Sequence, residues 1–277
     1  MRLGAPLIQP AADPVAWVAA VQAKGYRAAY CPLKLDADLA LIAAYREAAR
    51  QADIVIAEVG AWSNPLSPDP AIRTAALEKC KASLLLAERI GARCCVNIAG
   101  SRGEKWDGPH PADLTEATFD LIVTTTREII DAVQPRQAVY ALETMPWMYP
   151  DSLESYQRLI KAIERPGFGV HFDPVNLVNS PQRYFQNADL IRSCVAALGP
   201  QIRSVHVKDI QLADRLTVHL DEVRPGQGGL DLRTLLHSLS QLHPDLPIML
   251  EHLPNETEYD LAAAHVRAVA KAEGIAL

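Results

Sequence analysis

Short hydrophobic runs alternate along the chain with longer segments whose hydrophobic residues recur at helical spacing. Eight of the short runs predict β-strands, and they span residues 2–8, 27–31, 53–58, 93–98, 139–143, 169–173, 204–209 and 248–251. Short apolar runs bounded by turn-forming residues are typical of strands that are buried on both faces. The chain is therefore expected to build a sheet of parallel strands.

The segments between these runs predict helices, several of which begin with recognisable capping residues. Asp13-Pro14, Asp69-Pro70 and Ser180-Pro181 each place a capping side chain before a proline, the pattern of a helix N-terminus. Asp151-Ser-Leu-Glu154 resembles a capping box. The expected helices lie at about residues 14–24, 35–51, 70–91, 113–133, 230–242 and 257–272, and two more open near residues 151 and 180.

This alternation, without a break in composition, predicts a single (β/α)8 TIM barrel domain over residues 1–277. In that fold, the functional residues lie at the carboxyl ends of the strands. A doubly wound open sheet is the alternative architecture, but no glycine-rich phosphate-binding loop follows the first predicted strand.

Composition limits the function classes. Hydrophobic residues make up 49% of the 277 positions, so a large core can form, and the formal net charge is −6. An acidic chain disfavours nucleic acid as a partner. The five cysteines lack C-x-x-C spacing and form an odd set, which disfavours both a zinc ribbon and a disulfide framework. Without a secretion signal or a membrane-length apolar run, the sequence predicts a cytoplasmic protein with no membrane partner.

Four of the predicted strands end in side chains that can bind a metal ion, namely Glu143, Asp173, His206 and Glu251. In a barrel these strand ends meet on one rim, so the four side chains are expected to lie together. Three carboxylates and one imidazole suit a hard divalent ion, Mn²⁺ first and Mg²⁺ or Co²⁺ as alternatives, whereas a closed zinc site favours cysteine and histidine. The other interpretation is that these residues form ordinary salt bridges with Lys208 at the top of the barrel.

The motifs at these strand ends resemble those of the xylose-isomerase-like barrels. That superfamily of sugar phosphate isomerases and epimerases also includes ketose 3-epimerases, inosose dehydratases and AP endonucleases. The resemblance covers the whole chain. The motifs that support it are Leu142-Glu-Thr144, Phe172-Asp-Pro-Val-Asn176, His206-Val-Lys-Asp209, Pro225-Gly-Gln-Gly228 and Leu250-Glu251. It implies that the four residues above bind one divalent ion. It also implies that Glu143 and Glu251 act as the acid/base pair.

Six further residues are candidate substrate contacts. Lys208 shares a strand face with His206 and is expected to reach into the pocket beside the ion. His171 lies one layer deeper than Asp173 on the same face, so it is either a substrate contact or a core histidine. Asn176 stands where many epimerases of this group carry a histidine, which is a departure from their pattern. Three tryptophans that follow the third, fourth and fifth strands offer faces for a sugar ring: Trp62, Trp106 and Trp147. The polar residues of the loop after the seventh strand are expected to be solvated: His219, Asp221, Glu222 and Arg224.

Together these residues predict a divalent-metal-dependent sugar isomerase or epimerase that acts on a small keto-sugar or keto-polyol. The ion polarises a carbonyl, a proton leaves the neighbouring carbon to form an enediolate, and the two glutamates carry the proton. The alternative is a metal-dependent lyase or dehydratase, which uses the same enediolate to expel a leaving group from a keto-inositol or keto-sugar derivative.

Two other classes fit less well. A DNA-repair nuclease is disfavoured because this acidic chain lacks a basic groove and the many histidines of the AP endonucleases. A barrel that only binds sugar has no need of both glutamates. The expected partner is a small carbohydrate, and the sequence leaves open whether the protein forms a homo-oligomer.

Overall fold

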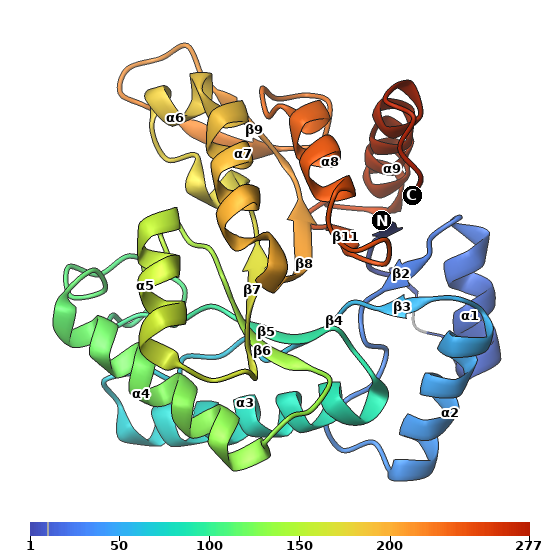
Figure 1. The fold of residues 1–277 in the computed structure, drawn as a ribbon, viewed down its shortest axis with the longest axis horizontal. Helices are drawn as coiled ribbons and strands as arrows, with labels where there is room; N and C mark the ends of the chain where they lie inside the picture. The colour runs from blue at the N-terminus through green and yellow to red at the C-terminus, as the bar shows by residue number, and fades with distance from the viewer. Residues whose placement is uncertain (10) are drawn as a thin grey trace.

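Nine short parallel strands form the central sheet of the computed structural model, which describes residues 1–9 and 11–277. They are β1 (Arg2–Gly4), β2 (Ala28–Ala29), β3 (Val55–Ile56), β4 (Glu58–Gly60), β5 (Cys94–Asn97), β6 (Val139–Glu143), β7 (Phe168–Phe172), β8 (Ile202–Val207) and β11 (Pro247–Leu250). Their order in the sheet is β3-β2-β1-β11-β8-β7-β6-β5-β4. Helices surround this sheet (Figure 1).

The two ends of the sheet are joined by a single residue, Ala57. Strand β3 pairs with β2, and β4 pairs with β5. Between them, the backbone N–H of Ala57 donates to Ala29 O at 2.8 Å, and its carbonyl accepts from Cys94 N at 3.3 Å. Strands β3 and β4 are therefore two halves of the predicted third strand, and the sheet forms a barrel. The prediction of a (β/α)8 TIM barrel is confirmed.

The main helices begin largely where the capping residues predict. Their bounds are α1 (Pro14–Ala23), α2 (Leu39–Gln51), α3 (Pro70–Ile90), α4 (Glu116–Val133), α5 (Leu153–Ile163), α6 (Pro181–Phe185), α7 (Asn187–Leu198), α8 (Leu232–Ser240) and α9 (Glu256–Ala272). Asp13, Asp69 and Ser180 each accept a backbone N–H bond at the start of a helix whose first turn holds a proline. Within residues 1–9 and 11–277, no helix combines the length and hydrophobicity needed to cross a membrane.

Two helices begin later than predicted because the cap lies further along the chain. Helix α4 begins at Glu116, after Thr115, whose side chain accepts from Thr118 N. Asp113 is instead part of the preceding loop, where its buried carboxylate accepts from Ser101 Oγ at 2.9 Å and from the backbone of Arg102 at 2.7 Å. Helix α2 likewise begins at Leu39, after its own cap, Asp38.

A third helix has the predicted position but a different cap. The cap of α5 is Ser152, which accepts from the backbone of Ser155, and the Ser155 hydroxyl accepts from the backbone of Ser152 in return. The expected partners Asp151 and Glu154 therefore do not form the capping box.

The loop after β8 is more ordered than predicted. The expected strand over residues 204–209 ends at Val207, and the chain continues as an antiparallel hairpin of β9 (Asp209–Leu212) and β10 (Leu220–Val223). Buried Asp209 holds this loop, because its carboxylate accepts from the backbone N–H groups of Gly226, Gly228 and Leu230 at 2.9 Å each. The hairpin thereby places β10 beside the barrel rim.

The inside of the barrel carries an unusual buried polar layer. Glu58, His171, Ser204 and His206 are each at most 1% exposed. Buried polar groups are costly unless they are paired, so such a layer in the middle of a core indicates a defined network.

Candidate functional site

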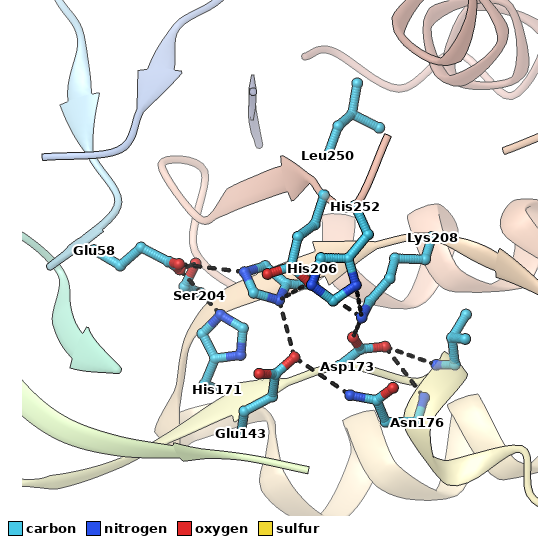
Figure 2. Close-up of polar contacts among 12 residues, drawn as sticks. Glu58, Glu143, His171, Asp173, Asn176, Ser204, His206, Lys208, Leu250 and His252 are labelled. Atoms are coloured by element: carbon cyan, nitrogen blue, oxygen red, sulfur yellow. Dashed lines mark hydrogen bonds and ion pairs between the residues drawn. The ribbon is translucent and has the colours of Figure 1, made fainter. Parts of the chain in front are cut away.

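The ends of four strands bring together the four side chains that were predicted to bind a metal ion. Glu143 ends β6, Asp173 follows β7, His206 lies in β8, and Glu251 follows β11. One ligand atom from each lies within 4.8 Å of the others. Glu143, Asp173 and His206 converge in the same way in Figure 2.

His206 lies at the centre of this cluster. Its Nδ1 atom is 3.0 Å from Glu143 Oε1 and 3.0 Å from Glu251 Oε2. Burial would lower the pKa of His206, but the surrounding carboxylates, Glu251 first among them, raise it well above its ordinary value. The imidazole therefore faces two anionic groups through one nitrogen.

Asp173 is fully buried, and its two carboxylate oxygens have different environments. Oδ1 accepts from the backbone N–H of Val175 at 2.9 Å and of Asn176 at 3.3 Å. Oδ2 has no well-directed hydrogen bond and lies 2.8 Å from the ammonium of Lys208. Burial raises the pKa of Asp173 to about 6, against the opposing effect of Lys208. One oxygen is thus held by the backbone, and the other faces a cation, the ammonium of Lys208.

Lys208 forms ion pairs with the same carboxylates. Its ammonium lies 2.8 Å from Asp173 Oδ2, 3.1 Å from Glu251 Oε2 and 3.4 Å from Glu222 Oε2, and its side chain is 2% exposed. The salt bridges with Lys208, which were the alternative explanation for this cluster, are therefore present. They do not account for the whole cluster, because Glu143 lies 3.0 Å from His206 Nδ1 and is not among the carboxylates that Lys208 pairs with.

The donor chemistry fits a divalent cation. Three carboxylates and one imidazole converge here, and the single ammonium of Lys208 is shared among Asp173, Glu251 and Glu222. Buried anions need a cation or strong hydrogen bonds, and an oxygen-rich set prefers hard divalent ions. Glu143, Asp173, His206 and Glu251 are therefore suited to hold one such ion.

A cavity of about 410 Å³ opens above the cluster. It is lined by seven of the predicted site residues: Glu143, Glu251, Lys208, Asn176, Trp62, Trp106 and Trp147. The Trp147 indole is fixed in place, since its Nε1–H donates to Asp107 O at 2.9 Å. The carboxylates of both predicted acid/base residues therefore share one cavity with three aromatic side chains.

His171 does not line this cavity. It is fully buried, and its Nε2 lies 3.0 Å from Glu58 Oε2 inside the barrel. The structure thus favours the core-histidine interpretation over the substrate contact. The remaining predicted residues, Asp173 and His206, are fully buried below the cavity floor.

Three residues at this site were missed by sequence reasoning. Glu222 lines the cavity although its segment was expected to be a solvated loop, because β10 folds back onto the rim. His252 also lines it, with a left-handed φ of 57°, and its Nδ1 is 3.2 Å from Glu222 Oε2. Glu58 lies beneath the cluster. Glu58 ends one predicted strand and His252 follows another, so their positions at strand ends are the sequence signal that could have identified them.

The fold is shared with several solved structures. The probable 3-DHS dehydratase AsbF from Bacillus anthracis has a TM-score of 0.71 and 16% identity, covering 98% of this chain and 99% of that one. D-psicose 3-epimerase in the presence of D-fructose has a TM-score of 0.70 and 14% identity, covering 98% of each chain. A Mycobacterium smegmatis xylose isomerase-like TIM barrel protein in complex with magnesium has a TM-score of 0.69 and 15% identity, covering 98% of this chain and 95% of that one.

At these identities the likeness concerns the fold. No curated protein matches the sequence significantly. The family model described as xylose isomerase-like TIM barrel, however, matches residues 18–269, which is most of the chain. This protein therefore belongs to the xylose isomerase-like TIM barrel family.

Proposed function

We propose that this protein is a divalent-metal-dependent isomerase or epimerase that acts on a small keto-sugar or keto-polyol. The observation that carries the proposal is the pair Glu143 and Glu251, which line one cavity and both lie 3.0 Å from Nδ1 of His206. The structural likeness to D-psicose 3-epimerase supports a reaction of this class.

Glu143, Asp173, His206 and Glu251 would hold the ion, with Mn²⁺ as the first candidate and Mg²⁺ or Co²⁺ as alternatives. A divalent ion bound there would polarise a carbonyl oxygen of the substrate. The protein's own part is to keep the four ligands close together beneath a cavity that admits the substrate from one side.

Glu143 and Glu251 are placed to move protons on two sides of a substrate. They come from β6 and β11, which the sheet order separates by β7 and β8. Burial alone would raise the pKa of both, but His206 outweighs it and holds each pKa below its ordinary value. Both glutamates are therefore ionised at neutral pH. One can accept the proton next to the carbonyl, and the other, once it has taken up a proton from solvent, can return that proton to the opposite face.

The rest of the cavity suits a small carbohydrate. Asn176 is held at the floor, where its side-chain N–H₂ donates to Thr144 O at 3.0 Å and lies 3.4 Å from Glu143 Oε1. The three tryptophans supply apolar faces on which the C–H groups of a sugar ring can pack. Lys208 supplies a buried positive charge beside both Asp173 and Glu251.

Replacing Lys208 with methionine should lower turnover by about 10²-fold, because a fixed charge next to the reacting oxygen is lost. Metal content should be retained, since the substitution removes a cation that competes for the same carboxylates. Turnover and elemental analysis of the purified variant measure the two effects. Lys105→Met is the matched control: Lys105 lines the same cavity but is 74% exposed, and its pair with Asp107 is weak. Metal loss in the Lys208 variant would instead indicate a structural role.

The proposed reaction itself is tested in deuterated water with a panel of ketohexoses and keto-inositols. We expect deuterium at the carbon next to the carbonyl, in a product that is otherwise unchanged in mass. Chelation of the metal should stop the exchange, and Mn²⁺ should restore it. A product that is lighter by water or by a leaving group would identify the enzyme as the lyase or dehydratase instead.

A further inference from the structure

A buried glutamate lies behind the proposed metal ligand His206. Glu58, at the start of β4, is 1% exposed and points into the barrel interior (Figure 2). Its Oε1 lies 3.2 Å from His206 Nε2. Its Oε2 lies 3.0 Å from His171 Nε2 and accepts from Ser204 Oγ at 2.9 Å. Three donors thus converge on one carboxylate, which acts as an acceptor to all of them.

The two ring nitrogens of His206 face opposite partners. Nδ1 faces Glu143 and Glu251, whereas Nε2 faces Glu58. A neutral imidazole carries one proton, and only the nitrogen without that proton can bind a metal ion. A metal ion held by Glu143 and Glu251 would exclude a proton from Nδ1, and the ionised Glu58 carboxylate, which accepts hydrogen bonds but cannot donate them, would then favour the tautomer with its proton on Nε2. In that tautomer the lone pair of Nδ1 points to the side of Glu143 and Glu251, where the metal ion would bind.

We propose that Glu58 is a positioning residue that fixes the tautomer and ring orientation of His206 for metal binding. This inference rests on the proposed function, in which His206 is a ligand. A second contact holds the ring in place, because the imidazole of His171 packs edge-on against it with centroids 4.1 Å apart and an interplanar angle of 73°. His171 and Ser204 in turn hold Glu58, which accounts for the polar layer inside the barrel.

Glu58, His171 and His206 also lie close enough together to hold an ion of their own. That arrangement is less favourable, since Nε2 of each histidine is already paired with a separate oxygen of Glu58. The cavity also ends above them, among Glu143 and Glu251. The network therefore serves the upper site.

The test is Glu58→Gln, which keeps the side-chain shape but removes the charge. We expect the dissociation constant for Mn²⁺ to rise by about 10- to 100-fold, the usual cost of losing an outer partner of a ligand histidine. Titration of the metal-free protein with Mn²⁺, followed by electron paramagnetic resonance, measures it. Glu88→Gln is the matched control, because it makes the same change at a carboxylate that accepts from the backbone of Gln137 and Ala138, outside this network. Its Mn²⁺ affinity should stay close to that of the unmodified protein.

The thermal unfolding of each metal-free variant separates positioning from stability. A Glu58→Gln protein that binds Mn²⁺ as tightly as the unmodified chain overturns the inference while leaving the proposed function standing. An unmodified chain that binds none of Mn²⁺, Mg²⁺ and Co²⁺ overturns both.

A measurement on the unmodified protein covers the case in which Glu58→Gln does not fold. In the Mg²⁺-loaded protein with ¹⁵N-labelled histidine, His206 should carry its proton on Nε2 and none on Nδ1. The His206→Asn variant assigns the signals. A proton on Nδ1 overturns the inference.

Discussion

Replacing Asp173 with asparagine is expected to remove the bound metal and to lower turnover by about 10³-fold or more. The asparagine oxygen can still accept from the backbone of Val175 and Asn176, so the local turn is preserved. Its amide N–H₂ replaces Oδ2, the oxygen that lacks a well-directed hydrogen bond and faces the cluster. A Lewis-acid metal supplies several kcal/mol of transition-state stabilisation, and each 1.4 kcal/mol is about tenfold in rate.

Elemental analysis after chelation and reconstitution, together with turnover on the best substrate of the panel, measures both effects. Glu88→Gln is the matched control. The Glu88 carboxylate also accepts backbone N–H bonds, but its donors are Gln137 and Ala138, which come before β6, whereas the metal site lies at the carboxyl end of that strand. The control should keep its metal. An Asp173→Asn protein with full metal content would remove this residue from the ligand set, and an unmodified chain without any divalent ion would contradict the metal site as a whole.

The barrel could be predicted because its signals are local. Each strand is a short apolar run, and helix starts such as Asp13-Pro14 and Asp69-Pro70 use side chains that bond the backbone two or three residues away. The candidate cluster followed from one geometric rule, that strand ends of a barrel meet on one rim. Glu143, Asp173, His206 and Glu251 could be brought together by that rule although they are distant in the sequence.

What could not be predicted depends on contacts across the barrel. Glu58 and His206 are 148 positions apart, and their bond depends on which side chains point inward from strands β4 and β8. Glu222 reaches the cavity only because Asp209 organises the loop after β8 through three backbone N–H groups. No periodicity in the sequence encodes either contact. The late start of α4 has a similar cause, since Asp113 bonds the loop before it rather than the helix after it.

The two glutamates should each serve one face of the substrate, so that replacing either with glutamine separates the two half-reactions. Glu251→Gln and Glu143→Gln should each lower net epimerisation by about 10²- to 10⁴-fold, the range for loss of a general acid or base. Each variant retains one glutamate, which can still remove a proton from the face that it reaches. In deuterated water, we expect each variant to exchange the proton of one epimer only, and the two variants to exchange opposite epimers. The unmodified protein should exchange both.

Metal content must be measured in the same samples, because both glutamates are also proposed ligands. The exchange rate of each variant is then divided by its content of bound ion before the variants are compared. Glu222→Gln is the matched control: it removes a carboxylate that lines the same cavity and lies 3.4 Å from Lys208, but that is not part of the ligand cluster. It should exchange both epimers. If one metal-loaded glutamate variant exchanges neither epimer while the other still exchanges one, a single base serves the site. The symmetric mechanism would then be wrong, and the position of Lys208 beside Glu251 would make it the acid that a lyase needs. If the two variants exchange the protons of opposite epimers, a single base cannot explain the result, because one base can remove a proton from only one face of the substrate.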